Sequence, residues 1–332
     1  MSQTFTNAFD QFLARQCTPQ RVRDIEANGD AVSLWQEIEK VGYADALVSE
    51  ANGGAGLSLR DVFGLFELCG LYALPVPFAE TMLARAFLGN AGVIRPTGSI
   101  AIAHGQVEID GSIICATVRA GRTAQKILAV VDGQCLLLKT SQASSCVAGF
   151  ALDATFTWPA AEANFAKCIP GIFDVRLVQG CIYAAMISGA LLRVFNMTLR
   201  YANDRIQFGR PIGKFQAIQH HLADMSEHVA AARMAAQIGC LSATAHPNRL
   251  QVAVAKARTS EAALQVANLG HAIHGAIGFT EEFDLQLFTR RLHVWRQAGG
   301  SESYWHDIGG GELVDRHTGS ALDLIRTTLV VS

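Results

Sequence analysis

The sequence has 332 residues, of which 50% are hydrophobic and 17% charged, and its formal net charge is −2. This length suits two or three domains, and the low charged fraction predicts that much of the surface is covered, most simply by oligomer interfaces. The chain has no basic run, no basic-then-apolar N-terminal segment and no uninterrupted apolar stretch of about 18 residues, which argues against nucleic-acid binding and a membrane span and favours a cytoplasmic protein.

Residues 1–92 are expected to form a helical N-terminal domain. Apolar residues recur at helical spacing in SLWQEIEKVGYADAL and in LRDVFGLFELCGLYA, and LPVPF ends the second pattern with two prolines. The glycine-rich stretch SEANGGAGLS lies between the two patterns and is expected to be a loop.

Residues 93–168 predict a small antiparallel β domain. Short β-rich runs such as SIAIAH, SIICATVRA, KILAVVDG and QCLLLKT follow one another, separated by Gly, Asp-Gly and Ser signals. Turn signals at about this spacing are typical of a barrel or a sandwich.

Residues 169–332 predict a C-terminal four-helix bundle. Four segments have a helical pattern and short connections, which favours antiparallel packing; they are 174–204, 214–245, 250–276 and 283–296. The expected fold class is therefore mostly α with a small β middle domain.

The cysteines and histidines give no metal-binding pattern. The eight cysteines are scattered, with no CxxC pair and no His at zinc-finger spacing, so reduced thiols in the core are expected. His220 and His221 lie on a helix without a third ligand at a suitable spacing, and no metal site is predicted.

The stretch RIQFGRPIGKFQAIQHHLADM, residues 205–225, is unusually rich in donors. Arg205, Gln207, Arg210 and Lys214 surround a Phe-Gly and a Pro between two helices. An Arg fork and an amide beside a helix N-terminus suit an anion such as a pyrophosphate. A solvated turn is the alternative interpretation of the same residues.

Several stretches together resemble the acyl-CoA dehydrogenases, flavoproteins that oxidise acyl-CoA thioesters to the α,β-enoyl form. Residues 205–225 are similar to that family's signature R-x-Q-F-G-x-P-I-x-x-F-Q-x-I-Q-H-x-L-A-D-M, and residues 271–292 resemble its Q-I-H-G-G-x-G-F-T-x-E block. VSEANGGAGLSLRDV and LPVPFAETMLA resemble its N-terminal domain. The resemblance covers nearly the whole chain and implies FAD as the cofactor.

The resemblance also implies which residues bind FAD. The turn that matches Arg205 to Gln207 contacts the pyrophosphate, and the block that matches 272–276 reaches the same FAD from a neighbouring protomer, although Ala272 and Ala276 replace the usual Gln and Gly. The expected cofactor-binding residues are Arg205, Gln207, Phe208, Phe215, Gln216, Ile273, His274 and Gly275. For His274, a histidine packed between helices is the alternative.

The family's reaction needs a carboxylate that takes the α-proton while a hydride leaves the β-carbon. The two positions where the family carries this base correspond here to Gly299 and Gln179, and neither side chain can accept the proton. Glu302 is a weak candidate for a displaced base, whereas Asp174 and Glu282 are explained as helix-terminal charges. The middle domain also lacks the family's T-E-P-x-A-G-S-D loop and its Trp-x-Thr strand.

Three hypotheses remain from the sequence. The favoured one is the FAD-holding subunit of a heteromeric acyl-CoA dehydrogenase, whose partner chain supplies the base; such pairs are associated with bulky thioesters such as steroid side chains. The second is a self-sufficient homo-oligomeric dehydrogenase that uses a displaced base such as Glu302. The third is a structural or interaction homologue without redox function. An electron-transfer flavoprotein as electron acceptor is implied by the resemblance only.

Overall fold

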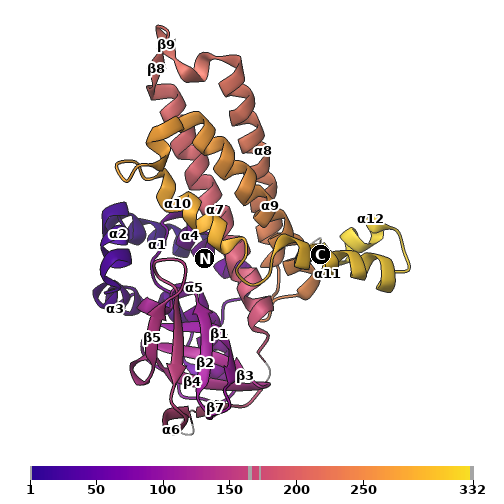
Figure 1. The fold of residues 1–332 in the computed structure, drawn as a ribbon. Helices are drawn as coiled ribbons and strands as arrows, with labels where there is room; N and C mark the ends of the chain where they lie inside the picture. The colour runs from indigo at the N-terminus through magenta and orange to yellow at the C-terminus, as the bar shows by residue number, and fades with distance from the viewer. Residues whose placement is uncertain (1, 164–166, 172, 330–332) are drawn as a thin grey trace. The chain divides into compact units, whose positions relative to one another are not determined.

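The computed structural model describes residues 2–163, 167–171 and 173–329. The expected fold class is confirmed: helices come first, a seven-stranded sheet follows, and the rest is mainly helical (Figure 1). The helices are α1 (Ser2–Gln16), α2 (Pro19–Asn28), α3 (Val32–Lys40), α4 (Leu59–Leu71), α5 (Phe78–Asn90), α6 (Ala160–Ala163), α7 (Val175–Asp204), α8 (Gln216–Gly239), α9 (Arg249–His274), α10 (Leu285–Trp295), α11 (Glu302–Gly311) and α12 (Ala321–Leu324). The strands are β1 (Ile100–Val107), β2 (Ile113–Val118), β3 (Lys126–Val131), β4 (Gln134–Lys139), β5 (Ser144–Val147), β6 (Ala154–Trp158), β7 (Lys167–Ile169), β8 (Ile206–Gln207) and β9 (Arg210–Pro211).

The chain divides into two compact units. The first comprises residues 1–62, 74–179 and 243–246, and the second comprises residues 63–73, 180–242 and 247–332. Both α4 and α7 contribute residues to each unit. The first unit holds the N-terminal helices together with the sheet, so the division into two units does not test the boundaries expected near residues 92 and 168. These boundaries stay a prediction.

Local signals set the ends of the N-terminal helices in the first unit. The Thr18 side chain accepts a hydrogen bond from the Arg21 N–H, Pro19 is the first residue of α2, and Gly29 ends the helix with a φ of 72°. These are the residue types that a helix start and a left-handed C-cap favour. The Phe9 ring stacks on Phe78 with centroids 4.9 Å apart, which packs α1 against α5.

The sheet of the first unit is mixed, so the expectation of a fully antiparallel β domain was wrong for one pair of strands. The strand order is β5-β6-β2-β1-β3-β4-β7, and β1 runs parallel to β3 over residues 100–105 and 126–131. β2 pairs with β1 only at residues 106–107 and then continues along β6. The segment 119–125 therefore returns the chain to the start of β1, and its turn signals cannot be distinguished in sequence from those of a hairpin.

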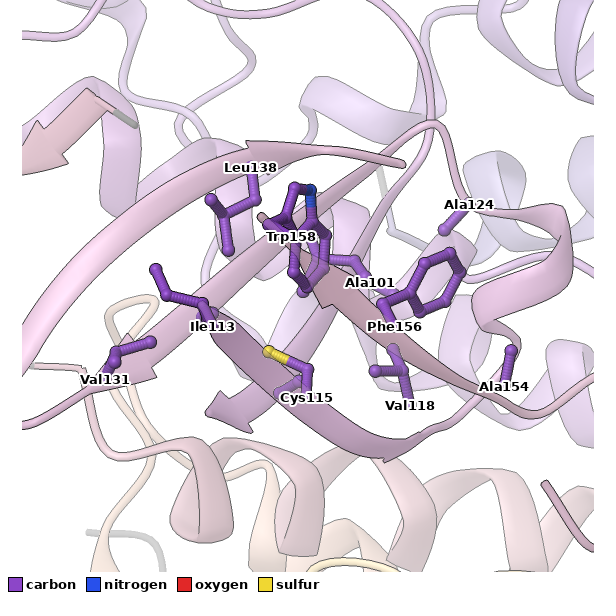
Figure 2. Packing of buried hydrophobic residues seen from close by; sticks show 13 residues of the cluster. Ala101, Ile113, Cys115, Val118, Ala124, Val131, Leu138, Ala154, Phe156 and Trp158 are labelled. Atoms are coloured by element: carbon purple, nitrogen blue, oxygen red, sulfur yellow. The ribbon is translucent and has the colours of Figure 1, made fainter. Parts of the chain in front are cut away.

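One face of this sheet encloses an apolar core. Buried side chains from β1, β2, β3, β4 and β6 form a single cluster in which Trp158 and Phe156 are the largest members (Figure 2). Their rings stack with centroids 5.7 Å apart, and the Trp158 indole N–H donates to the Lys139 carbonyl at 2.8 Å. The alternation of buried and partly exposed residues along β6 follows the period of two that a strand imposes.

The second unit contains the expected antiparallel helices. The four predicted segments correspond to α7, α8, α9 and α10, each slightly shorter than its pattern (Figure 1). Glycines let α4 and α7 approach closely: a Cβ on Gly70 would lie 1.7 Å from the Met186 carbonyl oxygen, and one on Gly189 would lie 1.9 Å from that of Glu67. Glu67 also forms an ion pair with Arg233 of α8 at 2.7 Å.

Helix α7 is long and apolar enough to cross a membrane by length and composition alone. Within its most apolar window, however, 72% of the residues are buried inside the protein. Because such burial is typical of a core helix, this property is weak evidence for a membrane span.

Candidate functional site

The donor-rich stretch folds as a tight hairpin between α7 and α8. Ile206 and Gln207 of β8 pair with Pro211 and Arg210 of β9, and the turn residues Phe208 and Gly209 have φ values of 51° and 77°. Positive φ at both central positions is typical of the two-residue turn that matches the twist of a hairpin. The Phe208 side chain is 92% exposed.

The hairpin carries positive charges that no described acidic side chain pairs with. Among the described residues, neither Arg205 nor Arg210 has a carboxylate oxygen within 4.0 Å, and the Arg210 guanidinium lies 4.2 Å above the Phe215 ring. Helix α8 begins at Gln216, directly after Phe215, without a side-chain cap on its first N–H groups. Exposed guanidinium groups beside uncapped backbone donors suit a phosphate-containing ligand.

The second expected cofactor segment lies close to the end of α7. The His274 ring stacks on Tyr201 with centroids 4.4 Å apart, and the Tyr201 hydroxyl donates to the His274 carbonyl at 3.4 Å. Gly275, with φ 66° and ψ −145°, ends α9 in a conformation that glycine adopts readily. The structure thus brings the segment 273–275 towards the helix that leads into Arg205.

The side chains within this segment differ in exposure. Ile273 and His274 are buried, with 6% and 4% of their surface exposed. Ala272, Gly275 and Ala276, which flank them, are exposed. A ligand at this surface therefore meets the backbone and the small residues first. A cofactor contact by the Ile273 side chain has no support from its position, and the cofactor roles in this segment stay predictions.

His274 is a buried, neutral histidine. Its Nδ1 lies 2.8 Å from the Gly270 carbonyl oxygen, which can only accept, so Nδ1 carries the hydrogen. Its Nε2 has no hydrogen-bond partner among the described residues. Burial lowers the pKa of His274 and outweighs the opposing effect of the Gly270 bond. The packed-histidine interpretation fits this side chain.

Gln179, one of the two base positions, has a structural contact in the first unit. Its Nε2 donates to the Ile102 carbonyl at 3.0 Å, and the Ile102 N–H donates to a buried Glu80 oxygen at 2.8 Å. Within the part of the chain that the structure describes, no strand pairs with this edge of β1 before residue 106, so side chains supply the hydrogen bonds that a strand would otherwise make. The Gln179 amide donates here, whereas an ionised glutamate at position 179 would place two acceptors against each other.

Gly299, the other base position, lies in a tight turn after α10. Gly299 and Gly300 have φ values of 67° and 107°, and the Trp305 indole N–H donates to the Gly299 carbonyl at 3.0 Å. A Cβ on Gly300 would lie 2.7 Å from the Tyr304 ring. The turn therefore requires glycine at position 300, and position 299 carries no side chain for proton transfer.

Glu302, the candidate for a displaced base, is paired with an arginine side chain. Its carboxylate forms an ion pair with the Arg296 guanidinium. Burial by itself raises the pKa of Glu302, but the backbone N–H and the Arg296 guanidinium outweigh it, so the pKa lies below its usual range. A carboxylate with a lowered pKa is a weak proton acceptor, which disfavours Glu302 as the base.

Asp174 and Glu282, the weaker acidic candidates, lie in two different surroundings. The Asp174 carboxylate accepts the Leu177 N–H at 2.9 Å at the start of α7, as expected for a helix-terminal charge. Glu282 lines a cavity of about 410 Å³ together with residues of α7 such as Arg193, Arg200 and Tyr201. Among the residues that the structure describes, no group of three or more His, Cys, Asp or Glu side chains could hold a metal ion, and all eight cysteines are free thiols.

Lys256 is a buried charged residue, close to the Gly299 turn, that the sequence interpretation missed. Its side chain is fully buried in α9, and its Nζ donates to the carbonyls of Arg296 and Gly300 at 2.8 and 3.2 Å. A lysine within the otherwise small and apolar stretch VAVAKA is the signal that could have identified it.

This chain is similar to known proteins over most of its length. A family model described as "Acyl-CoA dehydrogenase, C-terminal domain" matches residues 180–310. Acyl-CoA dehydrogenase IpdE2 from Mycobacterium tuberculosis is 32% identical over 287 residues, which cover 85% of this chain and 87% of the relative.

Two solved structures share the fold at low sequence identity. The ChsE4-ChsE5 complex from Mycobacterium tuberculosis matches with a TM-score of 0.82 and 21% identity over 96% of this chain and 98% of that chain. A variant of the Tcur3481-Tcur3483 steroid ACAD matches with a TM-score of 0.78 and 22% identity over 93% and 96%. Because IpdE2 is 32% identical to this chain over most of both sequences, the chain belongs to the acyl-CoA dehydrogenases. This is an oxidoreductase family whose members use FAD.

Proposed function

We propose that this chain is the FAD-holding subunit of a heteromeric acyl-CoA dehydrogenase that introduces an α,β double bond into an acyl-CoA thioester. The observation that carries the proposal is the state of the two base positions. Gln179 donates to a strand, and Gly299 lies in a turn that its neighbours fix. The Arg205 hairpin, by contrast, keeps exposed donors without carboxylate partners among the described residues.

The residues of the hairpin region fit FAD. Arg205 and Gln207 would bind the pyrophosphate, and Phe215 and Gln216 would contact the adenosine half next to the start of α8. Phe208 would also contact the cofactor. Bound FAD would supply the acceptor for the hydride of the substrate β-carbon. The proton at the α-carbon is then left for a carboxylate that this chain does not supply, which is why a partner chain is part of the proposal.

The comparisons support a partner and a bulky substrate. The ChsE4-ChsE5 structure is a complex of two chains, and the Tcur3481-Tcur3483 protein is described as a steroid ACAD. We infer a partner chain of the same fold and a bulky thioester such as a steroid side chain. An electron-transfer flavoprotein as acceptor and a cytoplasmic location complete the proposal.

The second candidate function is a self-sufficient homo-oligomeric dehydrogenase that uses Glu302. It rests on the proximity of Glu302 in sequence to the empty base position, and the Arg296 ion pair weakens it. A structural homologue without redox function is the third candidate. The unpaired Arg205 and Arg210 among the described residues argue against it, since exposed guanidinium groups next to a helix start suit a ligand.

A visible spectrum distinguishes the three candidates. The purified chain is titrated with FAD, and acyl-CoA substrates are then added anaerobically, with and without candidate partner chains from the same source. We expect bound flavin that is bleached only when a partner chain is present. Bleaching by the chain alone would replace the proposal with the self-sufficient enzyme, and a chain that binds no FAD under either condition would favour the structural homologue.

A further inference from the structure

The C-terminal half of α7 has an open face that carries charges of both signs. The helix is buried from Cys181 to Leu191, whereas beyond that point one of its sides borders the cavity of about 410 Å³ that Glu282 also lines. The α7 residues of this lining recur at helical spacing and so share one side of the helix; they are Arg193, Asn196, Met197, Arg200, Tyr201 and Asp204. Residues 282–284 complete the lining, and the whole face lies within the second unit.

Four charged groups on this face have no partner of opposite sign. Among the residues that the structure describes, Arg193, Arg200, Asp204 and Glu282 form no ion pair within 4.0 Å, although Arg200 and Asp204 lie one helical turn apart. The Arg193 Nε is buried without a hydrogen-bond partner in the described part of the chain, and the guanidinium lies 5.6 Å from the centroid of the Phe288 ring. A guanidinium whose donors are not all used within the chain suits an acceptor from outside it.

The charges are separated along the helix, with apolar groups between them. Arg193 and Asp204 are eleven residues apart, which at about 1.5 Å per residue places them about 16 Å apart along the α7 axis. Met197 and Tyr201 lie between them and are partly exposed, and the Tyr201 ring contacts Phe283 with centroids 5.9 Å apart. An apolar centre with a polar rim is the usual arrangement of a protein–protein contact.

We infer that this face binds a second copy of this chain, with the two α7 helices packed antiparallel across a two-fold axis. In such a contact, a residue pair on one side of the axis is repeated on the other side with the two chains exchanged. Arg193 of each copy therefore faces Asp204 of the other copy, and Met197 and Tyr201 of both copies meet near the axis.

The arrangement of the charges favours a second copy over a small ligand. The positive and the negative end lie on one helix face, so the surface is complementary to itself when it is turned by half a rotation. A small anion would pair only with the arginines and leave Asp204 and Glu282 without a partner. Opposite charges at the two ends also fix the register of the contact, because a shift along the helix would bring like charges together.

Charge reversal tests this register. Arg193→Glu would face the Asp204 carboxylate of the second copy, and Asp204→Arg would face its Arg193. Each variant alone is expected to lose one association step, with a dissociation constant for that step that is about tenfold higher or more. An equimolar mixture of the two variants is expected to recover the wild-type affinity, because both facing pairs then have opposite charges. Since Arg193 and Asp204 of one chain are too far apart to pair, such a recovery reports a contact between chains.

Sedimentation velocity of the full-length chains over a range of concentrations measures the association. The matched control is Arg15→Glu, which reverses an exposed arginine of α1 and is expected to associate as the wild type does. Wild-type affinity in both single variants, an equal loss in the control, or no recovery in the mixture would overturn the inference.

Other occupants of this face give different results. A wild-type chain that is monomeric by itself and associates only with a partner chain would overturn the second copy as the occupant, even if Arg193→Glu weakens that complex. If a charge-reversed chain does not fold, Arg193→Gln and Asp204→Asn replace the reversed variants. Weaker association of both than of the wild type then supports the inference, and unchanged association overturns it.

This inference goes beyond the proposed function and does not depend on it. A chain that binds no FAD but shows the recovery in the mixture would refute the proposed function and leave the α7 contact standing. A chain that binds FAD but associates equally well in all variants would refute the α7 contact alone.

Discussion

At the scale of single residues, the chain has groups that are proposed to bind a cofactor, and the two expected base positions hold Gln179 and Gly299, which cannot take a proton. Arg205 is exposed on a hairpin and has no carboxylate within 4.0 Å among the described residues, so its donors are available to a ligand. Gln179 shows the opposite case, since its amide completes the hydrogen bonding of β1. Both residues can be tested by single substitutions.

Arg205→Ala is expected to weaken FAD binding while leaving the bundle folded. The lost contact is charge-assisted and worth about 1.5–3 kcal/mol, which corresponds to roughly 10- to 150-fold in Kd. Fluorescence titration with FAD measures the change, and Arg15→Ala, which alters an exposed arginine of α1, is the control. An unchanged affinity would contradict the assignment of the hairpin.

Gln179→Glu is expected to lower the free energy of unfolding by about 1–3 kcal/mol at pH 7 and not to create a base. The carboxylate would face the Ile102 carbonyl, which raises its pKa in the folded state above the unfolded value of about 4.3. A protonated Glu can donate again, so the destabilisation should diminish as the pH falls towards and below that value.

Urea unfolding of Gln179→Glu at several pH values measures this effect. The wild-type chain at the same pH values is the reference for each difference. Equal stability of the two proteins at pH 7, or bleaching of flavin by substrate in the variant alone, would show that Gln179 is not a structural donor.

At the scale of the elements, the packing of α4 on α7 depends on two glycines. Gly70 and Gly189 let α4 and α7 approach until a Cβ would meet backbone carbonyls. Glycines in α11 differ, since a Cβ on Gly309 meets nothing within 4 Å. Replacement of glycine by alanine is therefore expected to have opposite effects on stability at Gly189 and at Gly309.

Gly189→Ala is expected to destabilise the chain by about 1–3 kcal/mol, because the helices must separate. Gly309→Ala is expected to stabilise it by up to about 1 kcal/mol through helix propensity. Urea unfolding of both variants under the same conditions checks the pair. Destabilisation by both, or by neither, would contradict the close contact of α4 and α7.

At the scale of the whole molecule, composition and surface both indicate association. Only 17% of the residues are charged, and large apolar side chains around the candidate cofactor segments are exposed, including Ile206, Phe208 and Phe279 at 62%, 92% and 70%. Exposed apolar residues next to a ligand site are typical of an interface.

The chain is therefore expected to form a dimer or a larger oligomer at micromolar concentration, alone or with a partner chain. Sedimentation velocity measures the mass of the assembly. Phe208→Asp, which replaces an exposed apolar ring by a charged group, is expected to reduce association. A stable monomer under all conditions, with or without FAD, would contradict this expectation and the site shared between protomers.

The sequence by itself determined the fold class, the four long helices and the candidate cofactor stretch, because each is recorded in local patterns. A helical pattern can be recognised within some ten to thirty consecutive residues, and the RIQFG stretch is contained in a single connection between two helices. The residue types at the two expected base positions, Gln179 and Gly299, were also readable, since they concern single positions.

The tertiary structure decided what depends on contacts between distant segments. The parallel pairing of β1 and β3 follows from where the segment 119–125 crosses, which turn residues do not reveal. The donor role of Gln179, the buried state of His274 and the contact of Lys256 with a turn about forty residues away each need a partner that sequence spacing does not specify. Long-range hydrogen bonds and close helix contacts arise only when the chain is folded, and for that reason they lay beyond the sequence.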